Sequence, residues 1–80
     1  MYKGPKKTLV EQIKEESVDR LRLARNPDIS TEALAELAKA EELAIRFEVA
    51  RNENTSAETL AELAKDEFIC VRMAVAGNKH

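Results

Sequence analysis

The segment LAELAK at residues 34–39 occurs again, unchanged, at residues 60–65, which is 26 positions later. Working outward from these two copies aligns residues 19–44 with residues 45–70 without a gap, and 13 of the 26 aligned pairs are identical. A partial third copy, residues 71–80, follows. A fixed period of this length is typical of proteins built from stacked helical units.

We call residues 19–44 the first unit, residues 45–70 the second unit and residues 71–80 a partial third unit. Residues 1–18 carry a few apolar side chains at helical spacing, and we interpret them as a degenerate capping helix. These apolar side chains are Leu9, Val10 and Ile13. The prediction is a single all-α domain over residues 1–80, a short solenoid of about three two-helix repeats.

Each unit is predicted to hold a longer and a shorter helix, because apolar residues recur at helical spacing. The longer helices should bury equivalent leucines, namely Leu34, Leu37, Leu60 and Leu63. The shorter helices are expected at about residues 18–25, 43–51 and 68–76. Each of these ends at an asparagine, which we expect to adopt left-handed backbone angles.

Capping residues mark the start of the longer helices. In the second unit, Thr55 and Glu58 have the spacing of a reciprocal capping box. Ile29 replaces the threonine in the first unit, so the cap there either moves to Ser30 or is lost.

Composition argues against several classes of protein. Thirteen basic and 15 acidic side chains give a formal charge of −2, so no global field favours nucleic acid or an anionic membrane. The sequence has no run of about 20 apolar residues. One cysteine, Cys70, and one histidine, His80, provide no ligand set for a metal, and we expect no cofactor. We expect a cytoplasmic protein without membrane contact.

Several of these residues resemble the leucine-rich repeat variant family. They are Ile45-Arg46, Val49-Ala50-Arg51-Asn52, Thr55, Glu58, Leu60, Leu63-Ala64 and Asp66. The resemblance covers nearly all of residues 19–78 and implies a right-handed solenoid of paired helices, related to HEAT and armadillo repeats, without a β-sheet. It implies no catalytic activity. The iron–sulfur segment known in this family is not expected here, because Cys70 lies within a unit.

Arginines recur inside the apolar arc of the shorter helices, at Arg20, Arg46 and Arg72. A semi-buried arginine requires a partner, since an unpaired buried charge is strongly destabilising. We predict a structural ladder of these arginines together with Asn26, Asn52 and Asn78. The candidate carboxylate partners are Glu16, Glu41 and Asp66. Recognition of a phosphate or carboxylate ligand by the arginines remains the alternative.

The outward face of the shorter helices is the candidate interaction surface. It changes from charged to small and apolar along the chain: Arg22, Arg25, Glu48, Arg51, Cys70 and Ala74. The leading hypothesis is a non-catalytic module that binds another protein, of unknown identity, through this face. The alternative is a nucleic-acid-binding accessory protein that adds Lys3, Lys6 and Lys7 to these arginines.

Catalytic motifs are not evident. Cys70 has no neighbouring histidine or lysine that would activate its thiol, and no glycine-rich phosphate loop is present. The most apolar stretch, residues 68–76, spans the end of the second unit and the start of the partial third unit. We therefore predict a two-fold homodimer through Phe68–Ala76, unless a partner protein covers that stretch instead.

Overall fold

The computed structural model describes residues 19–79, and these residues contain helices and no strand. Residues 19–25 are helical. The helices that follow are α2 (Thr31–Leu37), α3 (Leu43–Arg51), α4 (Ala57–Leu63) and α5 (Ile69–Gly77). The all-α prediction is confirmed for this part of the chain. The expected capping helix over residues 1–18 lies outside it.

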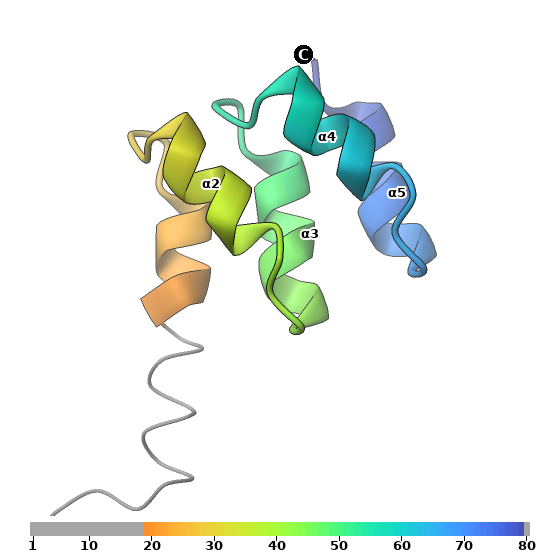
Figure 1. Ribbon diagram of the computed structural model, residues 1–80, viewed down its shortest axis with the longest axis horizontal. Coiled ribbons are helices and arrows are strands. Elements are labelled where there is room, and N and C mark those ends of the chain that lie inside the picture. Colours follow the sequence, from red (N-terminus) through yellow and green to blue (C-terminus); the bar gives the residue numbers. More distant parts are fainter. Residues whose placement is uncertain (1–18, 80) are drawn as a thin grey trace, which may run out of the picture.

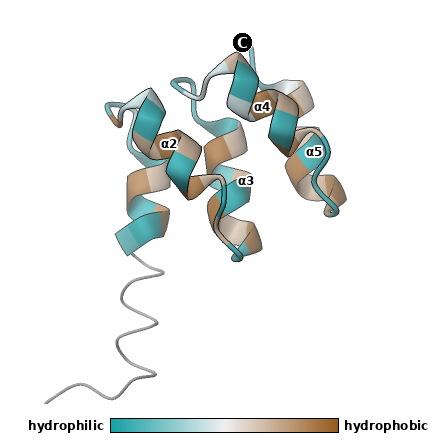
Figure 2. Ribbon diagram, viewed as in Figure 1, coloured by the Kyte–Doolittle hydropathy of each residue, from teal (hydrophilic) through white to brown (hydrophobic). Residues whose placement is uncertain are grey.

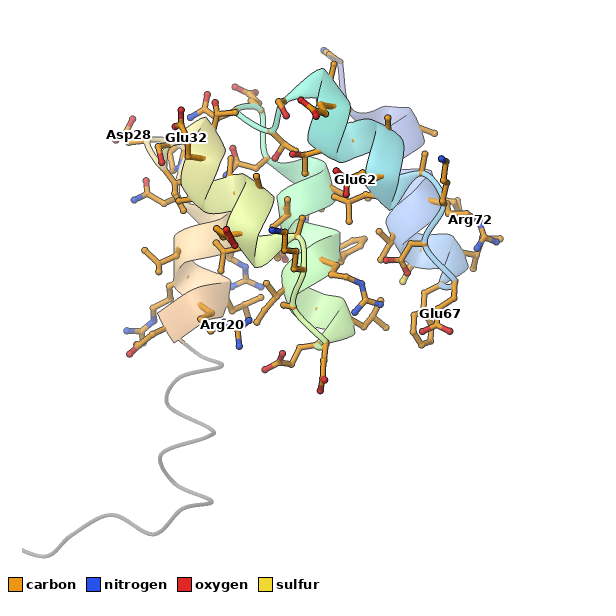
Figure 3. The ribbon with its side chains drawn as sticks, viewed as in Figure 1. Arg20, Asp28, Glu32, Glu62, Glu67 and Arg72 are labelled. Carbon is orange, nitrogen blue, oxygen red and sulfur yellow. The ribbon has the colours of Figure 1, made fainter. Side chains whose placement is uncertain are left out.

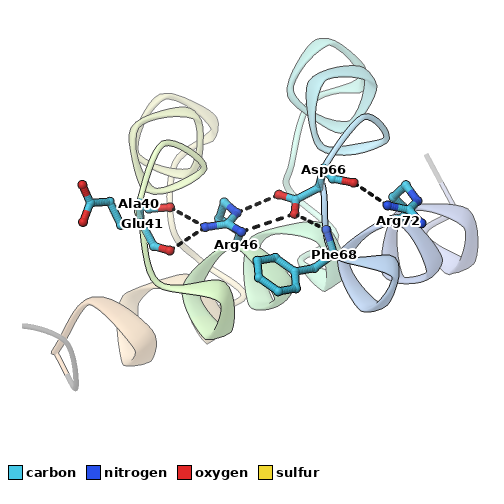
Figure 4. Close-up of polar contacts among 6 residues, drawn as sticks. All are labelled: Ala40, Glu41, Arg46, Asp66, Phe68 and Arg72. Atoms are coloured by element: carbon cyan, nitrogen blue, oxygen red, sulfur yellow. Dashed lines mark hydrogen bonds and ion pairs between the residues drawn. The ribbon is translucent and has the colours of Figure 1, made fainter.

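The helices form two layers, which Figures 1 and 4 show from different directions. The helical residues 19–25, α3 and α5 lie side by side in one layer, and α2 and α4 lie across them in the other. Both bounds of α4 lie 26 residues after those of α2, and both bounds of α5 lie 26 residues after those of α3. The sequence period is therefore also the period of the helices.

The core lies between the two layers. Its buried residues are Ala24, Ile29, Leu34, Ala40, Ile45, Val49, Ala50, Leu63 and Val71. Figure 2 shows α2 and α4 alternating between hydrophobic and hydrophilic ribbon, as expected for helices that bury one face. The predicted burial is confirmed for Leu34, Leu60 and Leu63, whereas Leu37 is only half-buried.

The predicted capping box is wrong. Ser56 caps α4, because its extended backbone lets its Oγ accept a hydrogen bond from the Thr59 N–H at 3.1 Å. Thr55 is fully buried and its Oγ1 donates to the Val49 carbonyl at 2.6 Å. In the first unit Ser30 caps α2 in the same way, which confirms one of the two alternatives. Ser30 and Ser56 occupy equivalent positions in the two units, and this shared serine is the feature of the sequence that could have predicted both caps.

The relative lengths of the helices are also reversed. The α2 and α4 helices have 7 residues each, while α3 and α5 have 9. The reason is that α2 and α4 end in tighter turns, where residue i bonds to residue i−3, as in the 3.0 Å bond from the Ala40 N–H to the Leu37 carbonyl. The bounds predicted for α3 are confirmed, and α5 lies one residue further along than predicted.

Candidate interaction surface

Arg25, Glu48 and Arg51 come together on the layer formed by residues 19–25, α3 and α5. Glu48 forms ion pairs with both arginines: its Oε2 lies 3.2 Å from Arg25 Nε and its Oε1 lies 3.7 Å from Arg51 Nη1. The Glu48 side chain is only 11% exposed, although the sequence analysis placed it on the outward face. The two arginine side chains remain largely exposed. One carboxylate thus holds two guanidinium groups at the surface.

A charged hollow of about 370 Å³ surrounds this cluster. We define it by its lining residues, Ala24, Arg25, Pro27, Glu48, Arg51, Asn52 and Glu53. It lies between residues of the first helical segment and residues of α3. The hollow holds two guanidinium groups and two carboxylates, those of Glu48 and Glu53, and the Arg25 and Arg51 side chains keep most of their surface exposed.

An apolar groove of about 440 Å³ lies between α3 and α5. We define it by Phe47, Arg51, Cys70, Met73, Ala74, Gly77 and Asn78. Arg51 lines both the groove and the charged hollow, and its Cζ lies 5.5 Å from the centroid of the Phe47 ring. This stacking keeps the guanidinium at the boundary between the two.

Five of the six predicted surface residues therefore line these two hollows. Arg22 is exposed on the first helical segment but is not among the lining residues of either. Sequence analysis missed Phe47 and Met73 as parts of this surface. The signal for Phe47 was its spacing of four residues before Arg51, which places the two side chains on the same face of a helix.

Arg46 forms the most buried ion pair that the structure gives among the described residues (Figure 4). Its Nε donates to Asp66 Oδ2 at 2.7 Å and its Nη2 to Asp66 Oδ1 at 3.3 Å. Its Nη1 donates to the carbonyls of Ala40 at 2.9 Å and Glu41 at 2.7 Å. The two side chains are 12% and 8% exposed. One side chain thus connects the loop after α2 to the loop after α4.

The pair shifts the pKa values of both groups. The hydrogen bond from Arg46 holds the pKa of Asp66 below its ordinary value, against the opposing effect of burial, and the Phe68 N–H adds to the lowering. The same hydrogen bond raises the pKa of Arg46. The Phe68 ring also lies 5.8 Å from Arg46 Cζ, which adds a cation–π contact to the pair.

Arg20 and Arg72 are not placed like Arg46. Arg20 Nη1 lies 3.6 Å from Glu42 Oε2, and the two side chains are 39% and 38% exposed. Arg72 is exposed and its Nη1 donates to the Asp66 carbonyl at 2.6 Å. The expected semi-burial is confirmed for Arg46 and Arg20 and is wrong for Arg72, which is exposed. Arg20 lacks the buried carboxylate that holds Arg46, because position 40, equivalent to Asp66, is an alanine.

The candidate carboxylate partners have different outcomes. Asp66 bonds to Arg46 through its carboxylate, whereas Glu41 bonds to the same arginine through its backbone carbonyl. Glu42 pairs with Arg20 but was not proposed from the sequence. Glu16 lies outside the described residues. Adjacent loop positions therefore contribute through different atoms, which residue type alone does not reveal.

The asparagines connect equivalent helix ends. Asn52 Nδ2 donates to the carbonyls of Ala24 at 2.9 Å and Asn26 at 3.0 Å. Asn78 Nδ2 repeats this 26 residues later, toward Ala50 at 2.8 Å and Asn52 at 3.0 Å. The backbone of both is extended, with φ of −73° at Asn52 and −78° at Asn78, so the expected left-handed angles are wrong. An extended backbone leaves the amide pointing to the preceding helix end.

A second link between the units was not foreseen from the sequence. Asn54 Nδ2 donates to the Ile29 carbonyl at 3.1 Å, and Thr31 Oγ1 donates to the Asn54 carbonyl at 3.1 Å. The residue equivalent to Asn54 in the first unit is Asp28, whose carboxylate has no N–H to donate. The link therefore depends on a residue that differs between the units.

Within residues 19–79, no three or more His, Cys, Asp or Glu side chains gather as they would to hold a metal ion. The Cys70 thiol is free and half-buried in the apolar groove. Among the helices of the same range, none has the length and apolar character needed to cross a bilayer. The chemistry that this surface offers is therefore charge pairing beside apolar contact.

Comparison with protein-family models, with curated proteins and with solved structures gives no significant match. The function has to be argued from the geometry of the chain itself.

Proposed function

We propose that the chain is a non-catalytic module that binds another protein through the charged hollow and the apolar groove. The observation that carries the proposal is their junction at Arg51, which places guanidinium groups directly beside an apolar surface. Protein interfaces combine these two kinds of contact, and arginine and aromatic residues contribute strongly to their affinity. A partner segment with an acidic residue next to an apolar one fits this arrangement.

We further propose that the units form a right-handed α-solenoid, in line with the resemblance to the leucine-rich repeat variant family. The bonds of Asn52 and Asn78 to helix ends 26 and 28 residues earlier support stacking of equivalent units. In a solenoid, stacked helices of one layer present a continuous surface for a partner. We keep the cytoplasm as the proposed compartment, because the single cysteine permits no internal disulfide.

Nucleic-acid binding is the alternative proposal, and it has less support. The Glu48 carboxylate already pairs with Arg25 and Arg51, so it offsets part of the charge that a phosphate backbone would meet. Binding to phosphates would weaken steeply with salt concentration. A protein partner held by the apolar groove would depend on salt far less.

The test compares proteins captured by the wild-type chain, by Arg51→Glu and by Lys65→Glu. Both variants reverse one exposed positive charge, but Lys65 lies just after α4, in the other layer. Circular dichroism first establishes that all three are folded. We expect Arg51→Glu to lose partners that Lys65→Glu retains, with contacts mapped to the groove by cross-linking. An unchanged set of partners in all three would contradict the proposal.

A further inference from the structure

Equivalent faces of α3 and α5 differ in burial. The face of α3 is covered by the rest of the chain, and that of α5 is exposed. On α3 this face consists of Leu43, Arg46, Phe47 and Ala50, at the spacing i, i+3, i+4 and i+7 of one helix side, and all four are buried or half-buried. The equivalent residues on α5 are Ile69, Arg72, Met73 and Ala76, and all four are exposed. Ile69 is 64% and Met73 66% exposed.

The way α3 is covered shows which chemistry such a face accepts. The Asp66 carboxylate bonds to Arg46 Nε and Nη2, and the Phe68 ring lies over the same guanidinium. The Asn78 amide donates to the Ala50 carbonyl. All three groups come from one segment, residues 66–78, which consists of a short acidic loop and a helix.

Arg72 shares one hydrogen bond with Arg46 and lacks the others. Its Nη1 donates to the Asp66 carbonyl, six residues earlier, as Arg46 Nη1 donates to the Ala40 carbonyl. Among residues 19–79, this is the one hydrogen bond that the Arg72 side chain makes in the structure. In Arg46 the Nε and Nη2 atoms hold a carboxylate, while Arg72 extends outward at the edge of the molecule (Figure 3).

We propose that the outer face of α5 binds a helical segment of another protein with the chemistry of residues 66–78. That segment carries a carboxylate just before its helix, for Arg72, and an aromatic residue two positions later. An amide at the far end of its helix bonds to the end of α5. The inference rests on the proposed role in protein binding. The outer face of α5 shares Met73 with the apolar groove but shares no residue with the charged hollow.

A second copy of this chain fits the face less well. The four positions on α5 carry one cation and no carboxylate. A two-fold dimer through this face would bring two Arg72 side chains into one interface, and like charges in an interface are costly. Charge complementarity therefore favours an acidic partner over the homodimer expected from the sequence.

The probe is a fluorescent peptide of residues 64–78 with Cys70→Ser. In the peptide Ile69 is replaced by lysine and Met73 by aspartate, and a lactam joins their side chains. This lactam keeps the peptide helical and blocks its own outer face, since short isolated helices are marginal in water. We expect saturable binding to the full chain by fluorescence anisotropy. Nitrogen-15 amide shifts should map the binding to Ile69, Arg72, Met73 and Ala76.

Arg72→Glu should weaken this binding about tenfold or more, while Arg22→Glu, which reverses an exposed charge on the first helical segment, should leave it unchanged. Ile69→Lys, at an exposed position, should weaken it without involving the Arg72 hydrogen bond. A peptide with Asp66→Arg should restore binding to Arg72→Glu.

Three results would overturn the inference: no saturable binding, equal binding to Arg72→Glu and wild type, or a wild-type homodimer that buries α5 and excludes the peptide. The capture experiment with Arg51→Glu tests the proposed function separately, because Arg51 lies on α3 and is not part of the outer face of α5.

Discussion

The first unit (residues 19–44) and the second unit (residues 45–70) have matching helices, yet different side chains link them to their neighbours. Asp66 of the second unit holds Arg46, whereas the equivalent position 40 is alanine and Arg20 relies on Glu42, which is partly exposed. Asn54 bonds across to the first unit, and its equivalent Asp28 has no N–H with which to do so. The residues that the units share thus build the helices, and some of the residues in which they differ build the strongest link.

The largest expected effect contrasts Arg46 with Arg20. Arg46→Ala should destabilise the fold by about 4 kcal/mol, because it leaves the largely buried Asp66 carboxylate without its cation. Arg20→Ala should cost less than about 1 kcal/mol, because its ion pair is partly exposed. Urea unfolding of both variants measures the difference. Equal costs would mean that burial of the pair has no energetic weight.

The asparagine bonds provide the next contrast. Asn52→Ala removes two bonds to the first unit and the acceptor for the Asn54 N–H, so we expect a loss of about 3 kcal/mol. Asn26 accepts from the Asp28 N–H, and Asn26→Ala should cost about 1 kcal/mol. Thermal unfolding of the two variants tests this order. A larger effect at Asn26 would contradict it.

Asp66, in the second unit, should contribute to the loss of folding stability at acid pH. The folded pKa of Asp66 lies below its unfolded pKa, so its stabilisation is complete above the unfolded pKa and is lost as the pH falls through the folded pKa. Asp66→Asn should therefore be less stable than wild type by about 2 kcal/mol at neutral pH.

That difference should shrink as the pH falls to about 3 and below. Urea unfolding of both proteins across this range gives the measurement, and the subtraction removes the contribution of other carboxylates. A difference that stays constant with pH would show that the charge of Asp66 is not what stabilises the fold.

Much of the helix layout was predictable from the sequence, and most of the links were not. The bounds of α3 followed from helical spacing that ends at Asn52. The hydrogen bond from the Asn52 amide to the Ala24 carbonyl could not be predicted, because it depends on where the preceding helix ends in space. Glu48 was expected on the outward face. Its burial between Arg25 and Arg51 was not predictable, because it arises only when helices pack side by side.

Helix caps should be more alike in the two units than the links are. Ser30→Ala and Ser56→Ala should each cost about 1 kcal/mol, because each serine accepts from the N–H three residues later. The cost should be somewhat larger at Ser56, whose Oγ also donates to Oγ1 of the buried Thr59 at 3.1 Å. Thr55→Val is the control. It should cost less than about 1 kcal/mol, since the Val49 carbonyl keeps its bond from the Asn52 N–H and the equivalent Ile29 is apolar. If Thr55→Val lost much more stability than Ser56→Ala, the assignment of the cap to Ser56 in place of Thr55 would be contradicted.

The smallest effect should come from giving the first unit the link that it lacks. A hollow of about 450 Å³, lined by Arg20, Ala40 and neighbouring residues, leaves room for a carboxylate at position 40. Ala40→Asp would place a carboxylate where the second unit has Asp66, within reach of Arg20 as Asp66 is of Arg46. We expect a gain of only about 0.5 kcal/mol, because Arg20 is partly exposed and Glu42 already pairs with it.

A double-mutant cycle with Arg20→Ala separates this pairing from other consequences of the substitution. Ala40→Asp should stabilise the chain when Arg20 is present and destabilise it when Arg20 is absent, since the new carboxylate then lies in a largely buried position without a cation. Additive effects in the cycle would mean that the equivalence of the two units extends to their helices but not to the geometry of their links.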